Sequence, residues 1–173
     1  MDEILPLVQA VLATTPDRWI TMAQSIPASL LHRLPAAGEW SALECLQHLL
    51  DAEQSVFPVR VICFLEGRDF PAFDPDSQGT KVEGTADALA LASEFGRLRQ
   101  QSLALLAKLT PADLPRKARH QELGPVTLDQ LLHEWAAHDL MHTVQAERAL
   151  MQPFIQGCGP WQHYFQDHIA HGG

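Results

Sequence analysis

The sequence contains little cysteine, and no two cysteines form a short motif. The three that occur, Cys45, Cys63 and Cys158, are odd in number and include no Cys-x-x-Cys pair. A disulfide framework needs an even set, so the composition predicts reduced thiols and a cytoplasmic location. We expect Cys45 and Cys63 to be buried and inert, because both lie in apolar helical patterns.

Basic residues are also scarce, and long apolar runs are absent. Twelve Lys and Arg stand against 21 Asp and Glu, which gives a net charge of −9, and the basic residues are scattered. Because nucleic-acid binding needs clustered Lys and Arg, we expect no nucleic-acid partner. No apolar run approaches the roughly 18 residues that span a bilayer. The chain begins with acidic residues where a signal peptide needs basic ones, so we predict neither membrane insertion nor export.

What the chain does have is enough apolar sequence for a core. It is 173 residues long and 46% hydrophobic, which predicts one domain over residues 1–173. Apolar residues at helical spacing predict four long helices with short extra helices. Their expected ranges are 2–24, 41–65, 86–109 and 127–151. This pattern indicates an all-α protein built as a four-helix bundle.

Local signals mark where these helices begin, bend and end. Capping boxes, in which a Ser or Thr precedes an acid or amide by three residues, are expected at Ser41, Thr110 and Thr127. Pro16 should kink or restart the first helix, and Pro58 should bend the second. Residues 70–85 read as a long polar loop, residues 116–127 as a loop or an irregular hairpin, and residues 159–170 as a short last helix.

Three of the nine histidines are candidates for a metal site. His138 and His142 are four residues apart in one predicted helix, so their side chains lie about 40° apart on one face. A third imidazole, from His48 on a facing helix, would complete one face of a coordination sphere. The alternatives are a solvated helix face or a hydrogen-bonded core pair.

Other histidines fit a metal site less well. His133 lies about 140° around the helix from His138, which excludes it from the same site. The segment from His133 to His138 also holds one residue too many for a zinc-protease HExxH motif. His163 and His168, near the C-terminus, are five apart and poorly placed for chelation on a helix. We expect Gln145 or Asp51 to support a ligand by hydrogen bonding, and Glu44 to serve its capping box.

Two segments resemble the signatures of the DinB-like (YfiT-like) superfamily. The first combines a Gly-x-Trp-Ser helix start with a histidine seven residues after the serine. Its matching positions are Gly38, Trp40, Ser41, Glu44, His48, Asp51 and Glu53. The second is a Gly- and Thr-Leu-led helix that ends in His-x-x-x-His-x-x-Gln. Its matching positions are Gly124, Thr127, Leu128, His138, His142 and Gln145. The order and separation of the two signatures extend the resemblance over most of the chain.

The resemblance implies an up-down-down-up arrangement of the four helices and a homodimer. It also implies a divalent transition metal, nickel or zinc before iron or manganese, held by His48, His138 and His142. Family members include thiol-dependent S-transferases and a mycothiol-dependent isomerase. A low-molecular-weight thiol is therefore an expected partner of the small-molecule site.

Three imidazoles leave a metal with open positions, which is the pattern of a catalytic site. They also leave the metal its full positive charge, which suits a thiolate. The leading functional hypothesis is therefore metal-dependent transfer of a thiol onto a small electrophile. The alternatives are a metal-dependent hydrolase and a non-catalytic metal-binding stress or interaction protein. The sequence assigns no role to residues 152–173.

Overall fold

The computed structural model describes residues 4–70 and 86–171, and the described chain is mostly helical. The polar loop expected over residues 70–85 lies outside this part except for Phe70. The α-helices are α1 (Ile4–Ser25), α2 (Ala28–Leu31), α3 (Ala42–Ser55), α4 (Phe57–Glu66), α5 (Ala88–Leu106) and α6 (Leu128–Gly157). Two 3₁₀ segments, η1 (Pro111–Asp113) and η2 (Gly159–His168), and two strands, β1 (Lys117–His120) and β2 (Gly124–Thr127), complete the described elements.

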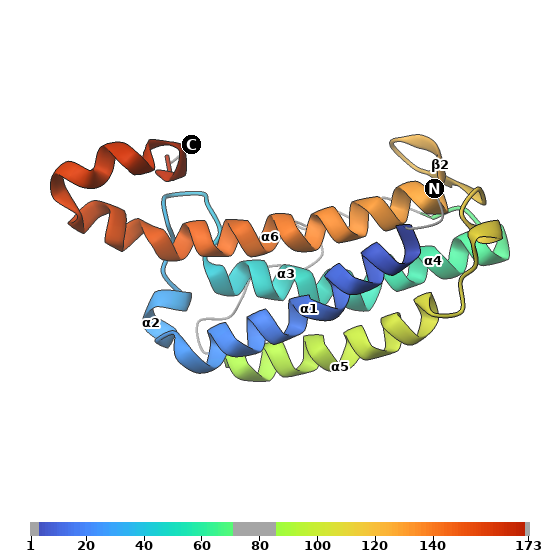
Figure 1. The fold of residues 1–173 in the computed structure, drawn as a ribbon, viewed down its shortest axis with the longest axis horizontal. Helices are drawn as coiled ribbons and strands as arrows, with labels where there is room; N and C mark the ends of the chain where they lie inside the picture. Colours follow the sequence, from blue (N-terminus) through green and yellow to red (C-terminus); the bar gives the residue numbers. More distant parts are fainter. Residues whose placement is uncertain (1–3, 71–85, 172–173) are drawn as a thin grey trace.

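The long helices form a four-helix bundle in which α4 continues the line of α3 (Figure 1). In Figure 1, α1 and α6 run in one direction, and the α3–α4 pair and α5 run in the other. The predicted up-down-down-up bundle is therefore confirmed. Both α1 and α3 pack against α5 and α6. Among the described residues, no helix combines the length and the apolar character needed to cross a membrane.

Capping boxes fix the starts of the two helices that carry the candidate histidines. At α3, the Ser41 hydroxyl accepts the Glu44 N–H at 3.2 Å, and the Glu44 carboxylate accepts the Ser41 N–H at 2.7 Å. Thr127 and Gln130 make the same reciprocal pair at α6. Each cap satisfies backbone donors that the helix leaves unpaired and contributes about 1 kcal/mol. These predicted helix starts, and the capping role of Glu44, are confirmed.

The prolines behave differently in different helices. Val56 interrupts the predicted second helix, and Pro58 then occupies the first turn of α4, where its missing N–H costs no hydrogen bond. The helix is therefore interrupted just before Pro58, where a bend was expected, and α4 then continues the line of α3. Pro16 does not restart the first helix, because α1 runs through it, with buried residues Leu12 and Trp19 packed on either side. Helix α6 likewise continues through Pro153 and ends six residues later than predicted, at Gly157.

The polar segment after α5 forms a short hairpin, one of the two alternatives that its sequence left open. Strands β1 and β2 pair antiparallel, from Lys117 opposite Thr127 to His120 opposite Gly124. Gly124 has a φ of 77°, a conformation that favours glycine at this turn. Phe70, just beyond α4, forms a parallel bridge with His120. The hairpin is thereby attached to the end of α4.

The buried apolar residues form two clusters, and Arg99 contacts both. Arg99 is fully buried, and its guanidinium carbon lies 4.8 Å from the Phe95 ring in one cluster and 5.6 Å from the Trp135 ring in the other. It donates hydrogen bonds to the Asp139 carboxylate at 2.6 and 3.1 Å and to the Glu53 carboxylate at 2.7 Å. Arg99 also donates a hydrogen bond to a backbone carbonyl of α1. This one side chain of α5 therefore contacts α1, α3 and α6. Cys45 and Cys63 are buried within these clusters, as expected.

Replacing Arg99 by Met should strongly destabilise the fold. The change keeps much of the volume but leaves the carboxylates of Glu53 and Asp139 buried together without a cation. The expected loss is about 3–5 kcal/mol in the free energy of unfolding, measured by chemical denaturation. Arg97→Met is the matched control, because Arg97 is exposed on the same helix and its ion pair with Glu94 is a surface pair. Equal stability of the two variants would show that the buried ion pairs contribute nothing.

Candidate metal centre

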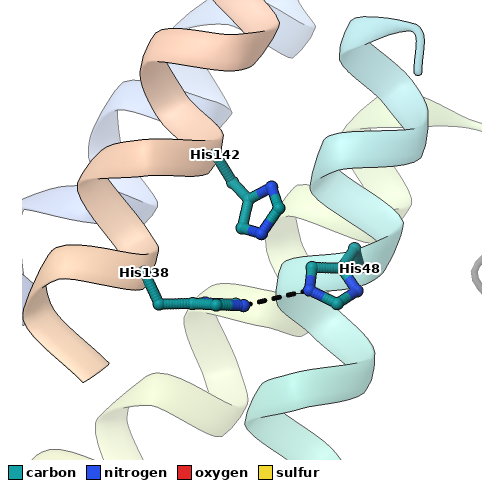
Figure 2. A group of neighbouring side chains, drawn as sticks. All are labelled: His48, His138 and His142. Atoms are coloured by element: carbon teal, nitrogen blue, oxygen red, sulfur yellow. Dashed lines mark hydrogen bonds between the residues drawn. The ribbon is translucent and has the colours of Figure 1, made fainter. Parts of the chain in front are cut away.

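Helices α3 and α6 bring the three candidate histidines together. His48 projects from α3, and His138 and His142 project from successive turns of α6 into the space between the two helices (Figure 2). The Nε2 atoms of His48 and His138 are 3.0 Å apart. Each of the three residues offers a ring nitrogen within 4.8 Å of the others. The described residues contain one such group, and the histidines near the C-terminus are not part of it.

The donor set fits a divalent transition metal. Two nitrogens bound to one zinc at about 2.0–2.1 Å in tetrahedral geometry lie about 3.3 Å apart, close to the observed 3.0 Å. Imidazole is a ligand that zinc and nickel share. The two Nε2 atoms are within hydrogen-bond distance, so one ring donates to the other in the metal-free chain, and a bound cation would take the place of that bond (Figure 2). The ring nitrogens therefore match a metal by position and by chemistry.

Burial keeps the imidazoles in the neutral form that a metal requires. Burial, together with the charge of His142, lowers the pKa of His48 to about 4. Burial, followed by the charges of His142, His48, Arg99 and Arg60, lowers the pKa of His138 to about 3. Burial also lowers the pKa of His142. Near neutral pH, protons therefore do not compete for these nitrogens.

Hydrogen bonds orient part of the triad. The amide oxygen of Gln145 can only accept, so it places the ring proton of His142 on Nδ1, 2.8 Å away, and leaves Nε2 as the free lone pair. This contact agrees with the expectation for Gln145. Asp51 instead accepts the Gln47 amide at 2.8 Å, so the expected support of His48 by Asp51 is not seen. The Nδ1 atom of His138 is buried without a hydrogen-bond partner among the described residues.

Aromatic rings surround the triad. Trp40 stacks on His142 with ring centroids 5.7 Å apart and lies 5.0 Å from His48. The Phe57 ring meets His138 edge-on at 5.1 Å. These contacts restrict the imidazole rotamers. They also explain the place of Trp40 at the start of α3, one residue before the cap.

The triad forms part of the wall of a cavity of about 390 Å³, within the usual range for small-molecule sites. The remaining wall is largely apolar, with Arg60, His120, Glu122 and Glu134 as its other polar residues. Sequence reasoning missed Arg60 and His120, and the only available signal was an Arg within an otherwise apolar helical stretch. His133 is exposed and borders a different hollow, which confirms its exclusion from the triad.

The low pKa values predict how the metal-free protein responds to acid. An unfolded histidine binds its proton near pH 6.5, but folded His48 does so only near pH 4. The unfolded chain therefore binds more protons in this window, and stability should fall as the pH drops from 6.5 to 4. In His48→Gln, this dependence should be weaker by about 1 kcal/mol per pH unit.

The measurement is urea unfolding in the presence of a chelator at several pH values. His133→Gln is the matched control, since the His133 side chain is 59% exposed and its loss should leave the pH dependence unchanged. If the slope for His48→Gln equals that of the unmodified chain, His48 titrates normally in the folded protein. That result would contradict the conclusion that the triad histidines are neutral near pH 7.

Comparison with known proteins extends these observations. The chain is similar to YfiT from Bacillus subtilis, a solved structure described as a probable metal-dependent hydrolase with an unusual four-helix bundle topology. The two are 20% identical, with 89% of each chain covered and a TM-score of 0.78, so they share a fold. No curated protein matches the chain. A model of the DinB superfamily matches residues 12–146, a stretch that includes all three triad histidines. The chain therefore belongs to the DinB superfamily.

Proposed function

We propose that this protein is a divalent-metal-dependent enzyme that transfers a small thiol onto a small electrophile. The observation that carries the proposal is the convergence of three neutral imidazoles in the wall of a cavity large enough for a small molecule. A structural metal site usually has four protein ligands and no open face. The three-ligand set and its adjoining cavity support a site with a position for substrate.

His48, His138 and His142 hold the metal in this proposal, with nickel or zinc as the leading candidates. The chemistry that such a metal supplies when bound is Lewis-acid activation of a thiol or a water near neutral pH. The protein contributes neutral ligands through burial and an oriented imidazole through the Gln145 contact. Trp40 and Phe57 pack against the imidazole rings and restrict their orientation.

The character of the cavity favours a thiol over water as the nucleophile. Three neutral nitrogens leave the metal its full positive charge, and zinc and nickel both accept thiolate ligands. The walls beside the triad include Trp40, Val56, Phe57 and Met141, which suit the carbon and sulfur atoms of a small thiol. In the proposed reaction, the sulfur forms a bond to the electrophilic carbon, the leaving group departs with its electron pair, and the thiol proton passes to solvent.

Hydrolysis is the second candidate, and the description of YfiT as a probable metal-dependent hydrolase favours it. That reaction needs a group to accept a proton from water. The acidic residues of the cavity wall, Glu122 and Glu134, are both exposed, and Glu134 lies 4.0 Å from Arg60. Because both side chains are exposed to solvent, neither is fixed in position as a general base, and hydrolysis is the weaker candidate. A metal-binding protein without catalytic activity is the remaining alternative.

Metal content gives the first test. Protein purified without an affinity column and incubated with nickel or zinc should bind about one equivalent per chain after desalting, measured by mass spectrometry of the metals. His48→Ala should retain less than half an equivalent, because two imidazoles on one helix bind more weakly than three. His133→Ala is the control and should retain the full amount. Equal metal content in all three proteins would show that the triad does not hold the metal.

Activity separates the two reactions. The metal-loaded protein should accelerate loss of a chloronitrobenzene electrophile with glutathione, mycothiol or bacillithiol, and His48→Ala should lose at least about 100-fold of that rate. A nitrophenyl ester, assayed without thiol, measures hydrolysis. Ester cleavage that depends on His48, without any thiol-dependent reaction, would replace transfer by hydrolysis. No activity in either assay, with metal bound, would favour the non-catalytic alternative.

A further inference from the structure

Arg60 is a buried cation with little protein to neutralise it. Its side chain is 8% exposed, and the one ion pair that it makes with a described residue joins it to Glu134, whose carboxylate lies 4.0 Å away and is 53% exposed. No residue of the described ranges accepts a hydrogen bond from its guanidinium. Buried arginines are ordinarily paired with an acceptor at hydrogen-bond distance, as Arg99 is in this same protein. Arg60 borders both the triad cavity and an adjoining hollow, so a ligand bound there could supply the missing acceptor.

His120 adds a second donor to the same part of the wall. The backbone N–H groups of Glu122 and Leu123 both donate to its Nδ1 atom at 3.2 Å. These bonds require a lone pair on Nδ1, so the neutral ring carries its proton on Nε2. His120 is 8% exposed and borders the same two hollows as Arg60. The hairpin turn therefore fixes a neutral N–H donor beside the guanidinium.

One phenyl ring holds the two donors in place. The Arg60 guanidinium carbon lies 5.0 Å above the Phe70 ring, and the His120 ring meets the same phenyl edge-on at 5.7 Å. The bridge between Phe70 and His120 fixes the backbone at this point. Arg60 comes from α4 and His120 from β1, so two elements far apart in sequence supply one polar patch. Such prior orientation reduces the entropy cost of binding a ligand.

We propose that Arg60 and His120 form a carboxylate subsite, and that the small molecule bound beside the triad carries a carboxylate. This inference rests on the proposed function, since it describes the other end of the same substrate or thiol. An arginine fork and an adjacent N–H match the planar oxygens of a carboxylate. A phosphate dianion fits less well, because Arg60 is the single Lys or Arg among the described residues of this wall and two glutamates border it.

Binding to the metal-free full-length protein tests the subsite without any reaction. Pentanoate and pentanamide have similar size, but only pentanoate carries a charge. In nuclear magnetic resonance titrations of protein labelled at arginine and histidine, pentanoate should shift the Arg60 Nε and His120 Nε2 signals. Its dissociation constant should be at least about tenfold lower than that of pentanamide, as expected for a charge-assisted hydrogen bond. Equal binding of the two compounds would overturn the proposal.

Variants assign the preference to Arg60. Arg60→Gln should reduce the preference for pentanoate to within about twofold, and Arg60→Lys should retain part of it, because the charge remains without the fork. Glu134→Gln should raise pentanoate affinity by removing the competing carboxylate. Arg97→Gln, an exposed arginine on α5, is the matched control and should leave the preference unchanged. Circular dichroism checks folding, and an unchanged preference in folded Arg60→Lys and Glu134→Gln would also overturn the proposal.

Thiols distinguish this proposal from the proposed function. Cobalt-loaded protein is titrated with mercaptocarboxylates of several chain lengths and with mercaptoalcohols of matched length, and the sulfur-to-metal absorption band is followed. Both proposals are supported if the band appears at lower concentrations of mercaptocarboxylate than of mercaptoalcohol, and if this difference disappears in Arg60→Gln. If no thiol gives a band but pentanoate still shifts Arg60, thiol transfer is wrong and the subsite stands. If both kinds of thiol give the band at equal concentrations, and pentanoate binds no better than pentanamide, the carboxylate subsite is wrong and thiol transfer remains supported.

Discussion

The buried ion pairs of Arg99 with Asp139 and Glu53 are the constraint on which this bundle depends. They occupy the junction of two apolar clusters, where a guanidinium without acceptors would be costly. Asp139 directly follows His138 on α6, and Glu53 lies little more than one turn beyond His48 on α3. Because both acids bind one cation, the relative rotation and axial position of α3 and α6 are fixed next to the imidazoles. The geometry of the candidate site therefore depends on the packing of the core.

A cost accompanies this arrangement. Polar groups at the centre of the bundle divide the apolar core, and Nε of Arg99 and Oε1 of Glu53 are buried without partners among the described residues. Apolar side chains of equal volume would often be as stable. The ion pairs are better understood as a means of alignment, since they accept one register of the four helices and disfavour others. This interpretation agrees with their position beside the triad rather than at the bundle ends.

The helices and the His138–His142 pair were accessible from the sequence because each has a local signal, whereas the up-down-down-up arrangement of the helices was implied by the family resemblance. Capping boxes at Ser41 and Thr127, and the four-residue spacing of His138 and His142, depend only on helix geometry. The facing of His48 toward this pair came from a family resemblance, because periodicity within one helix carries no information about its neighbour. Arg60 and His120 were missed for the same reason. Their proximity depends on Phe70 and the hairpin, and a strand pair of four residues each has too little pattern to be recognised.

Because of the β1–β2 hairpin, one part of the cavity wall is made of packed helices and another part is made of a surface turn. The part of the wall that holds the histidine triad belongs to long helices whose positions the core determines, whereas another part includes a surface turn with an exposed Leu123 near His120. Loops change in length and sequence at far smaller cost to stability than packed helices do. A bundle built in this way can keep the histidine triad constant while the turn diverges. Selectivity for different small molecules can then evolve, or be engineered, through a few residues that contribute nothing to the core.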